Sequence, residues 1–69
     1  MTQTDMILRH LRDFGSITPV EALREYGCMR LGARIWDLKQ AGYDIRAAKE
    51  TAKNRYGKPV SFARYTLRQ

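Results

Sequence analysis

The sequence predicts a small α+β domain that is mainly α-helical, with three helices followed by a small antiparallel β-hairpin of two or three strands. Apolar residues recur at helical spacing in three segments before Gly42, and after Gly42 they alternate with polar residues as in a half-buried strand. The 69 residues contain no linker or repeat, so we expect a single domain over 1–69. The hairpin needs the helices, because two strands alone are marginally stable in water.

The first helix is expected at residues 2–14. Three apolar residues are spaced to line one of its faces, namely Ile7, Leu11 and Phe14. Thr2 and Asp5 have the spacing of an N-terminal cap. His10 lies beside the apolar face, where we expect a half-buried packing side chain and not a ligand or a catalytic base. Ile17 follows in a segment too short for a helix, and it predicts a minimal edge strand.

Residues 18–42 predict two helices joined by a glycine turn, which is the outline of a helix-turn-helix. Thr18 supplies a capping oxygen, and Glu21 completes the capping box of a helix at residues 19–26. Three residues of this helix are spaced to face the first helix, namely Val20, Leu23 and Tyr26. Gly27 suits the turn because glycine adopts positive φ without a steric penalty.

A third helix is expected at residues 30–41, with a buried stripe formed by Leu31, Ile35 and Leu38. Arg30 lies at the edge of the opposite face, which is formed by Met29, Ala33, Trp36, Asp37 and Gln40. No Ser, Thr or Asn stands at the expected N-cap, so the start of this helix is the least defined boundary. Gly42 is expected to end it in the left-handed conformation.

The hairpin is expected at residues 43–67. Its first strand, with one buried face, is predicted by the alternating residues Tyr43, Ile45 and Ala47. A polar and basic loop is expected over residues 50–59. The second strand follows over residues 60–67, where one face is formed by Ala63, Tyr65 and Leu67.

The net charge of +6 is divided unevenly along the chain. Residues 1–27 carry three basic and four acidic side chains, whereas residues 28–69 carry ten basic and three acidic ones. A basic surface kept only for solubility would not be expected to show this asymmetry. One-sided positive charge favours binding to a polyanion such as nucleic acid.

Three segments of the chain resemble a family of small winged helix-turn-helix DNA-binding domains of phage and prophage type. These segments are Ile17–Leu23 with its EAL sequence, Arg34–Lys39 with RIWDLK, and Gly42–Ile45 with GYDI. The resemblance extends over about residues 4–67. It implies double-stranded DNA as the partner, a third helix in the major groove, and a basic hairpin, or wing, on the backbone and minor groove. It also implies transcription regulation or another phage-linked DNA transaction.

Candidate DNA-binding residues lie on the third helix and on the wing: Met29, Arg30, Ala33, Arg34, Arg46, Lys49, Lys53, Asn54, Arg55, Tyr56, Lys58 and Arg64. Arg30 is suited to a bidentate contact with guanine, and Arg55 is the candidate for the minor groove. Arg34 has two interpretations, a DNA contact or an ion pair with one of two carboxylates, Asp37 and Glu21. For Trp36, packing under the wing is favoured over a protein interface or a contact with the DNA backbone.

Several other function classes are disfavoured. Cys28 and His10 are the only cysteine and histidine, too few for a structural zinc site. No nucleophile–base pair, carboxylate cluster or phosphate-binding glycine loop indicates an enzyme, and no cofactor is expected. No apolar run approaches the roughly 20 residues that span a bilayer, and no leader is recognised at the N-terminus. We therefore expect no membrane partner and a location in the bacterial cytoplasm.

Two alternatives stay open. A winged-helix protein-interaction module would use Trp36 and Met29 to dock a protein partner, and a basic wing would also suit the backbone of structured RNA. On DNA, a homodimer or a larger assembly is expected, because one small domain rarely buries enough surface for high specificity.

Overall fold

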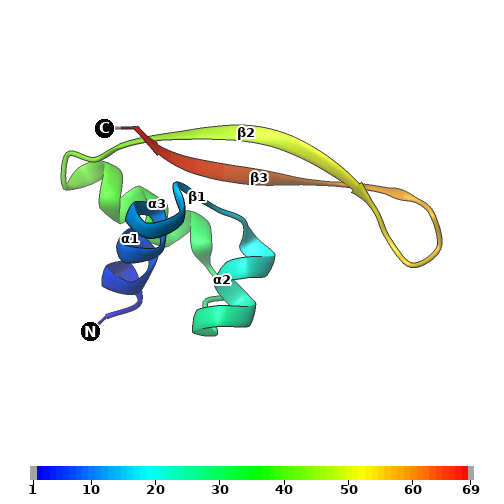
Figure 1. The fold of residues 1–69 in the computed structure, drawn as a ribbon, viewed down its shortest axis with the longest axis horizontal. Coiled ribbons are helices and arrows are strands. Elements are labelled where there is room, and N and C mark those ends of the chain that lie inside the picture. The colour runs from blue at the N-terminus through cyan, green and yellow to red at the C-terminus, as the bar shows by residue number, and fades with distance from the viewer. Residues whose placement is uncertain (1, 69) are drawn as a thin grey trace.

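Three helices and a three-stranded antiparallel sheet form the structure, a computed structural model that describes residues 2–68. In chain order the elements are α1 (Gln3–Phe14), β1 (Ser16–Ile17), α2 (Pro19–Tyr26), α3 (Leu31–Gln40), β2 (Asp44–Lys53) and β3 (Pro59–Arg68). The helices pack against one end of the sheet, and the β2–β3 hairpin extends beyond them (Figure 1). The predicted fold class, an α+β winged helix-turn-helix, is confirmed. No helix in the described range is long and apolar enough to cross a membrane.

The helix-turn-helix segment begins with the predicted capping box. Thr18 N donates to Glu21 Oε1 at 2.9 Å, and Glu21 N donates to Thr18 Oγ1 at 3.3 Å. Two otherwise free donors at the start of α2 are thereby satisfied. Gly27 ends this helix with a φ of 65°, and its N–H donates to the carbonyl of Leu23 at 2.9 Å. The left-handed glycine allows the chain to turn toward α3.

α3 begins one residue later than predicted, because Arg30 is its N-cap residue and makes no side-chain capping hydrogen bond. At the other end, the N–H groups of Gly42 and Tyr43 donate to the carbonyls of Lys39 and Leu38, each at 3.1 Å. These two bonds form the Schellman pattern of a helix C-terminus. They direct the chain from α3 into β2.

One hydrophobic core holds the helices against the root of the hairpin. The predicted stripes are confirmed at five buried residues of the first and third helices, namely Ile7, Leu11, Leu31, Ile35 and Leu38. The core also includes four residues from α2, the turn and the strands: Ile17, Ala22, Cys28 and Ile45. Ile17 belongs both to the predicted short strand and to the core, so it joins the sheet to the helices.

The buried face of α2 differs from the predicted one. Val20 and Leu23 were expected against α1, but both are exposed. The buried residue is Ala22, and the half-buried Tyr26 follows it one turn later. A small side chain at Ala22 lets α2 approach the core closely, and this leaves Val20 and Leu23 on the solvent side.

His10 is more deeply buried than predicted. Its Nδ1 lies 2.8 Å from the hydroxyl oxygen of Tyr26, so the imidazole links α1 to α2. Phe14, expected to continue the buried stripe of α1, is exposed in the last turn of the helix. Its ring still lies against the imidazole, with ring centroids 4.7 Å apart. The histidine therefore has a packing role.

β3 lies between β1 and β2, and all pairs are antiparallel. β1 contributes two pairs, in which Ser16 lies opposite Thr66 and Ile17 lies opposite Tyr65. The predicted edge strand at Ile17 is confirmed. Beyond these pairs, β3 has a strand neighbour on one side alone within the described residues.

The strands of the hairpin are longer, and its loop shorter, than predicted. β2 and β3 pair over ten residues each, as far as Lys53 opposite Pro59. The loop expected at residues 50–59 is a turn at 54–58. Ala47 is exposed although it alternates with the buried Ile45. Backbone pairing does not require burial of side chains, so the ladder continues where no core covers it.

Two matched substitutions test this packing. Leu11 is 1% exposed and Leu23 is 53% exposed. Leu11→Ala is expected to lower the free energy of unfolding by about 2–5 kcal/mol, comparable with the whole stability of so small a domain, about 3–5 kcal/mol. Leu23→Ala removes the same atoms from an exposed position and is expected to change the free energy of unfolding by less than about 1 kcal/mol. Urea denaturation followed by circular dichroism measures both, and equal losses would contradict the exposed position of Leu23.

Candidate nucleic-acid interface

The hairpin ends in a closely hydrogen-bonded segment, residues 53–59, which we call the wing tip. Asn54 Oδ1 accepts from the backbone N–H groups of Tyr56 at 2.9 Å and of Lys58 at 3.1 Å. Two backbone bonds close the same turn, from Asn54 N to Lys58 O at 2.9 Å and from Gly57 N to Asn54 O at 3.0 Å. Asn54, predicted as a DNA contact, thus uses its carbonyl oxygen to shape the turn. Its amide nitrogen is not used by these bonds.

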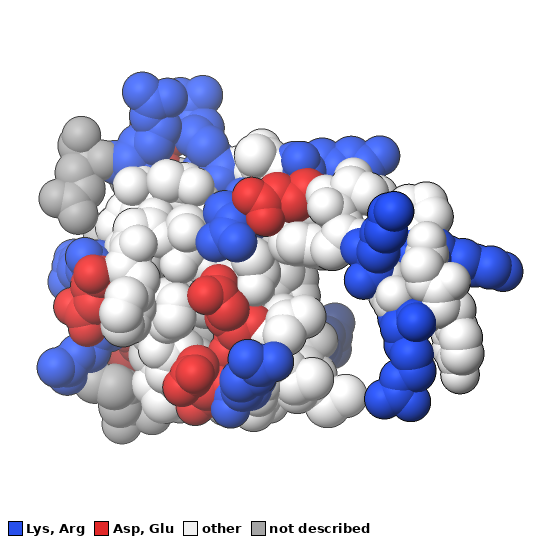
Figure 2. Space-filling model, turned by 45° about the vertical axis from the view of Figure 1, so that its right-hand side comes forward, with Lys and Arg blue, Asp and Glu red and all other residues white. Residues whose placement is uncertain are grey.

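Positive charge gathers at and beside the wing tip. In the part of the chain that the structure describes, no ion pair is formed by four of the predicted DNA-binding residues: Lys49, Lys53, Arg55 and Lys58. Figure 2 shows blue side chains around the protruding end of the hairpin, while red ones lie on the helical body and near the middle of the hairpin. The charge asymmetry of the sequence is therefore also an asymmetry in space.

Arg46 was predicted to extend the basic surface along the wing, but it has a carboxylate partner. Its Nε lies 2.9 Å from Asp44 Oδ1, and both side chains are largely exposed. This hydrogen bond lowers the pKa of Asp44 and raises the pKa of Arg46. Residues two apart on a strand share a face, so the pair follows from local geometry. A DNA phosphate must displace Asp44 before it can interact with the full charge of Arg46.

Arg64, also predicted to extend the basic surface, connects the hairpin to the start of α2. Its Nε donates to Glu50 Oε2 at 2.8 Å on the neighbouring strand, and its Nη1 donates to Ser16 Oγ at 3.0 Å. The same Nη1 lies 3.9 Å from Glu21 Oε1, in the carboxylate that caps α2. The hydrogen bond to Glu50 raises the pKa of Arg64. These contacts give Arg64 a structural role in place of a free position on the basic surface.

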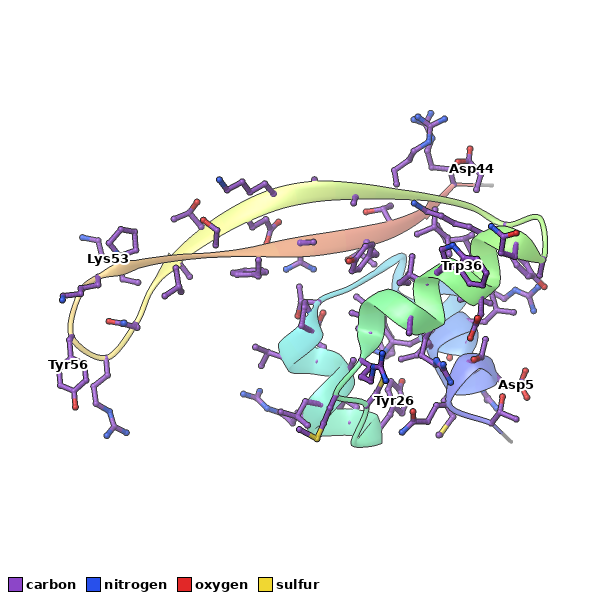
Figure 3. All side chains as sticks on the ribbon, turned by 180° about the vertical axis from the view of Figure 1, so that it is seen from behind. Asp5, Tyr26, Trp36, Asp44, Lys53 and Tyr56 are labelled. Atoms are coloured by element: carbon purple, nitrogen blue, oxygen red, sulfur yellow. The ribbon has the colours of Figure 1, made fainter. Side chains whose placement is uncertain are left out.

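The outer face of α3 carries little charge. Trp36 is 61% exposed and lies on the outer side of the helix (Figure 3), so the predicted packing under the wing is wrong. Ala33 on the same face is partly buried, and Arg30 is exposed at the N-cap. Successive helical residues are about 100° apart, so Trp36 points away from the stripe that contains Ile35.

Arg34 forms an ion pair within α3. Its Nη2 lies 3.3 Å from Asp37 Oδ2, and its Nε is buried without a hydrogen-bond partner among the described residues. The sequence left two carboxylates open as partners, and Asp37 is the one used, while Glu21 lies near Arg64. The pair offsets the charge of Arg34, which reduces its attraction for DNA.

Met29 is 85% exposed, but it adjoins α2 and not Trp36. It borders a shallow apolar groove of about 230 Å³, whose other lining residues are Pro19, Val20, Leu23 and Cys28. Val20 and Leu23, which were predicted to face α1, therefore form an exposed apolar surface with Met29. Trp36 does not line this groove.

A second, open cavity of about 450 Å³ lies between α1, β1, α2 and β3, and its lining includes His10, Glu25 and Arg64. His10 Nε2 is buried and has no hydrogen-bond partner within residues 2–68. Burial raises the pKa of Tyr26, and the charge of Glu25 adds to this shift. No group of three or more His, Cys, Asp or Glu that could hold a metal ion occurs among the described residues. The cavity was not predicted, because its lining comes from four separate elements.

Comparison with known protein families matches residues 2–69 to a winged helix-turn-helix domain. The matched range includes the α2–α3 segment and the whole β2–β3 hairpin. No curated protein and no solved structure matches the chain. The roles of individual residues therefore rest on the geometry of this chain.

The different positions of Arg64 and Arg46 lead to a prediction. Arg64→Gln is expected to lower the melting temperature and to speed amide hydrogen exchange at Ile17 and Leu67, because the hairpin loses its contacts with α2. Arg46→Gln is the matched control on the same hairpin and is expected to leave both unchanged. It should instead raise the pKa of Asp44 toward its ordinary value, since it removes the hydrogen bond that lowers it. Nuclear magnetic resonance measures exchange and titration, and unchanged exchange in Arg64→Gln would contradict its connecting role.

Proposed function

The chain belongs to a winged helix-turn-helix domain family, and on this basis we propose that it is a non-enzymatic protein that binds double-stranded DNA. The observation that carries the proposal is a group of cations at the far end of a protruding hairpin that have no carboxylate partner among residues 2–68. The structure measures 39 Å along its longest axis and 22 Å along the next. With α3 in a major groove about 12 Å wide, the hairpin extends over the adjoining backbone.

The wing supplies most of the affinity. Lys49 and Lys53 lie on one face of β2, about 13 Å apart along the strand, and contact successive parts of the phosphate backbone. Arg55 and Lys58 contribute charge from the turn, and Arg55 enters the minor groove where it is narrow. Each phosphate that is neutralised releases counterions, so this part of the binding depends on salt and not on sequence.

α3 lies in the major groove and carries a small share of base recognition. Arg30, exposed at the start of the helix, contacts guanine O6 and N7. Ala33 is short enough to lie against a thymine methyl group. Trp36 contacts the sugar–phosphate edge of the groove. Arg34 remains paired with Asp37 and helps to position the helix.

So few base contacts imply modest specificity for one domain, so a homodimer or a larger assembly on DNA supplies the remaining discrimination. The likeness of the Arg34–Lys39 and Gly42–Ile45 segments to phage- and prophage-type domains supports a role in transcription regulation or another phage-linked DNA transaction. Such a protein acts in the bacterial cytoplasm, where the DNA is located.

A second candidate function is protein interaction, favoured by the exposed ring of Trp36 and by the apolar groove beside Met29. Exposed tryptophan is typical of the residues that dominate protein interfaces. Trp36→Ala distinguishes the two functions. Loss of self-association or of a protein complex, with DNA binding retained, would favour interaction; loss of DNA binding alone would favour the first proposal.

Removing two wing-tip charges tests the main proposal. The double variant Lys53→Gln, Arg55→Gln is expected to weaken binding to all duplex sequences and to reduce the slope of log Kobs against log salt by about 1.8, because each phosphate contact contributes about 0.9. The control Arg9→Gln, Arg12→Gln removes the same charge from α1 and is expected to change the slope little. Fluorescence anisotropy of a labelled duplex between about 50 and 200 mM salt measures both.

Two results would contradict this proposal: equal effects of the two double variants, or no duplex binding by the unaltered protein at low salt. A structured RNA of equal length serves as competitor. If the RNA displaces the duplex at a lower concentration than unlabelled duplex does, the polyanion bound is RNA.

Base recognition by Arg30 leads to a separate prediction. Arg30→Ala is expected to relax the preference at one base position, with a loss of about 1–3 kcal/mol in discrimination. Lys53→Ala is the control and is expected to weaken all sequences alike. Selection of bound sequences from random duplex DNA measures the preference and also reveals any operator symmetry. If Arg30→Ala selects the same sequences as the unaltered protein, Arg30 does not read bases.

A further inference from the structure

The aromatic ring of Tyr56 at the wing tip is not needed for the phosphate contacts. Its side chain is 81% exposed and points outward from the end of the hairpin (Figure 3). The backbone N–H of Tyr56 is held by Asn54 Oδ1 at 2.9 Å, and Gly57 follows it with a φ of 77°. The turn is therefore already formed, and it presents a planar ring to solvent at its apex.

The surroundings of the ring are cationic. Lys53, Arg55 and Lys58 lie in the same short segment, and none of them forms an ion pair within residues 2–68. An anchor for an apolar protein partner would be expected among other apolar side chains, whereas the neighbours of Tyr56 in the turn are Arg55 and Gly57. The ring is thus placed next to charges that suit phosphate.

The wing tip also stands clear of the helices. The last ion-pair contact between the hairpin and α2 is made by Arg64, and Pro59 lies five residues nearer the turn. Five residues of strand correspond to about 16 Å. A nucleic-acid strand can therefore reach both faces of the ring without meeting the helical body.

An aromatic ring beside cations is the combination by which proteins bind single strands, because every base has a face that stacks on the ring while the cations hold the phosphates. Inside a continuous duplex, the neighbouring pairs already cover both faces of each base. A free base face occurs at the end of a duplex or where its two strands separate.

We propose that Tyr56 stacks on the first unpaired base at a junction between double- and single-stranded DNA. The protein then prefers forked or partly unwound DNA to continuous duplex. The inference rests on the proposed DNA-binding function and names the form of DNA that the wing tip selects. Lys53, Arg55 and Lys58 hold the phosphates on either side of the stacked base.

The experiment compares two labelled DNAs with the same duplex sequence, one blunt and one with two non-complementary arms. The unaltered protein is expected to bind the forked DNA about tenfold more tightly. Tyr56→Phe keeps the ring and the preference. Tyr56→Leu keeps apolar bulk without a π face, and it is expected to bind the forked and the blunt DNA with equal affinity. Lys53→Gln is the charge control and weakens both DNAs equally.

A fluorescent base analogue, 2-aminopurine, at the first unpaired position gives a second readout. The unaltered protein and Tyr56→Phe are expected to quench its fluorescence by stacking, and Tyr56→Leu is not. Equal affinity of the unaltered protein for both DNAs, or a fork preference retained by Tyr56→Leu, overturns the inference and leaves the proposed function intact. Failure of the unaltered protein to bind either DNA overturns both.

Discussion

The pairing of β1 with β3 is the contact on which the shape of the domain depends. β1 has two residues, yet Ile17 lies both in the sheet and in the core, and Leu67 N donates to Gly15 O at 3.2 Å beside it. A two-stranded hairpin has little stability of its own, so its root must be held by the helical body. The direction in which the wing points is therefore set at Ile17, at the opposite end of the hairpin from the residues proposed to bind DNA.

Most of the structure that depends on residues three or four apart could be predicted, although Phe14, three residues after Leu11, is exposed. The capping box at Thr18 and the buried stripe through Ile35 are of this kind. The buried face of α2 is not, because this eight-residue helix has apolar side chains on two faces. Only contact with the core determines that the face with Ala22 is buried and the face with Val20 and Leu23 is exposed. The length of the hairpin's two strands was also underestimated, since their outer halves are held by backbone pairs that leave no pattern of burial in the sequence.

The charge of the candidate interface could be predicted from the sequence, but the ion pairs and hydrogen bonds of its arginines could not. The unequal division of charge along the chain indicated a basic hairpin, and the wing tip has it. The partners of Arg64 could not be read from the sequence, because Glu50 and Ser16 lie 14 and 48 residues away. Glu21 illustrates the same limit, since it caps its own helix as predicted and also approaches Arg64. Arg46 and Arg64 are thus engaged with carboxylates, and the cations at the wing tip face solvent.

β2 is an edge strand along its length in the described sheet, because β3 separates it from β1. The outer backbone groups of such a strand are a template onto which a strand of a second molecule can add. Lys49 and Lys53 lie along this strand and form no ion pair among residues 2–68, and like charges on two such edges repel each other. The cations proposed to hold DNA therefore also keep free molecules from aggregating, while bound phosphate cancels that repulsion. Affinity for DNA and colloidal stability are in this way properties of the same side chains.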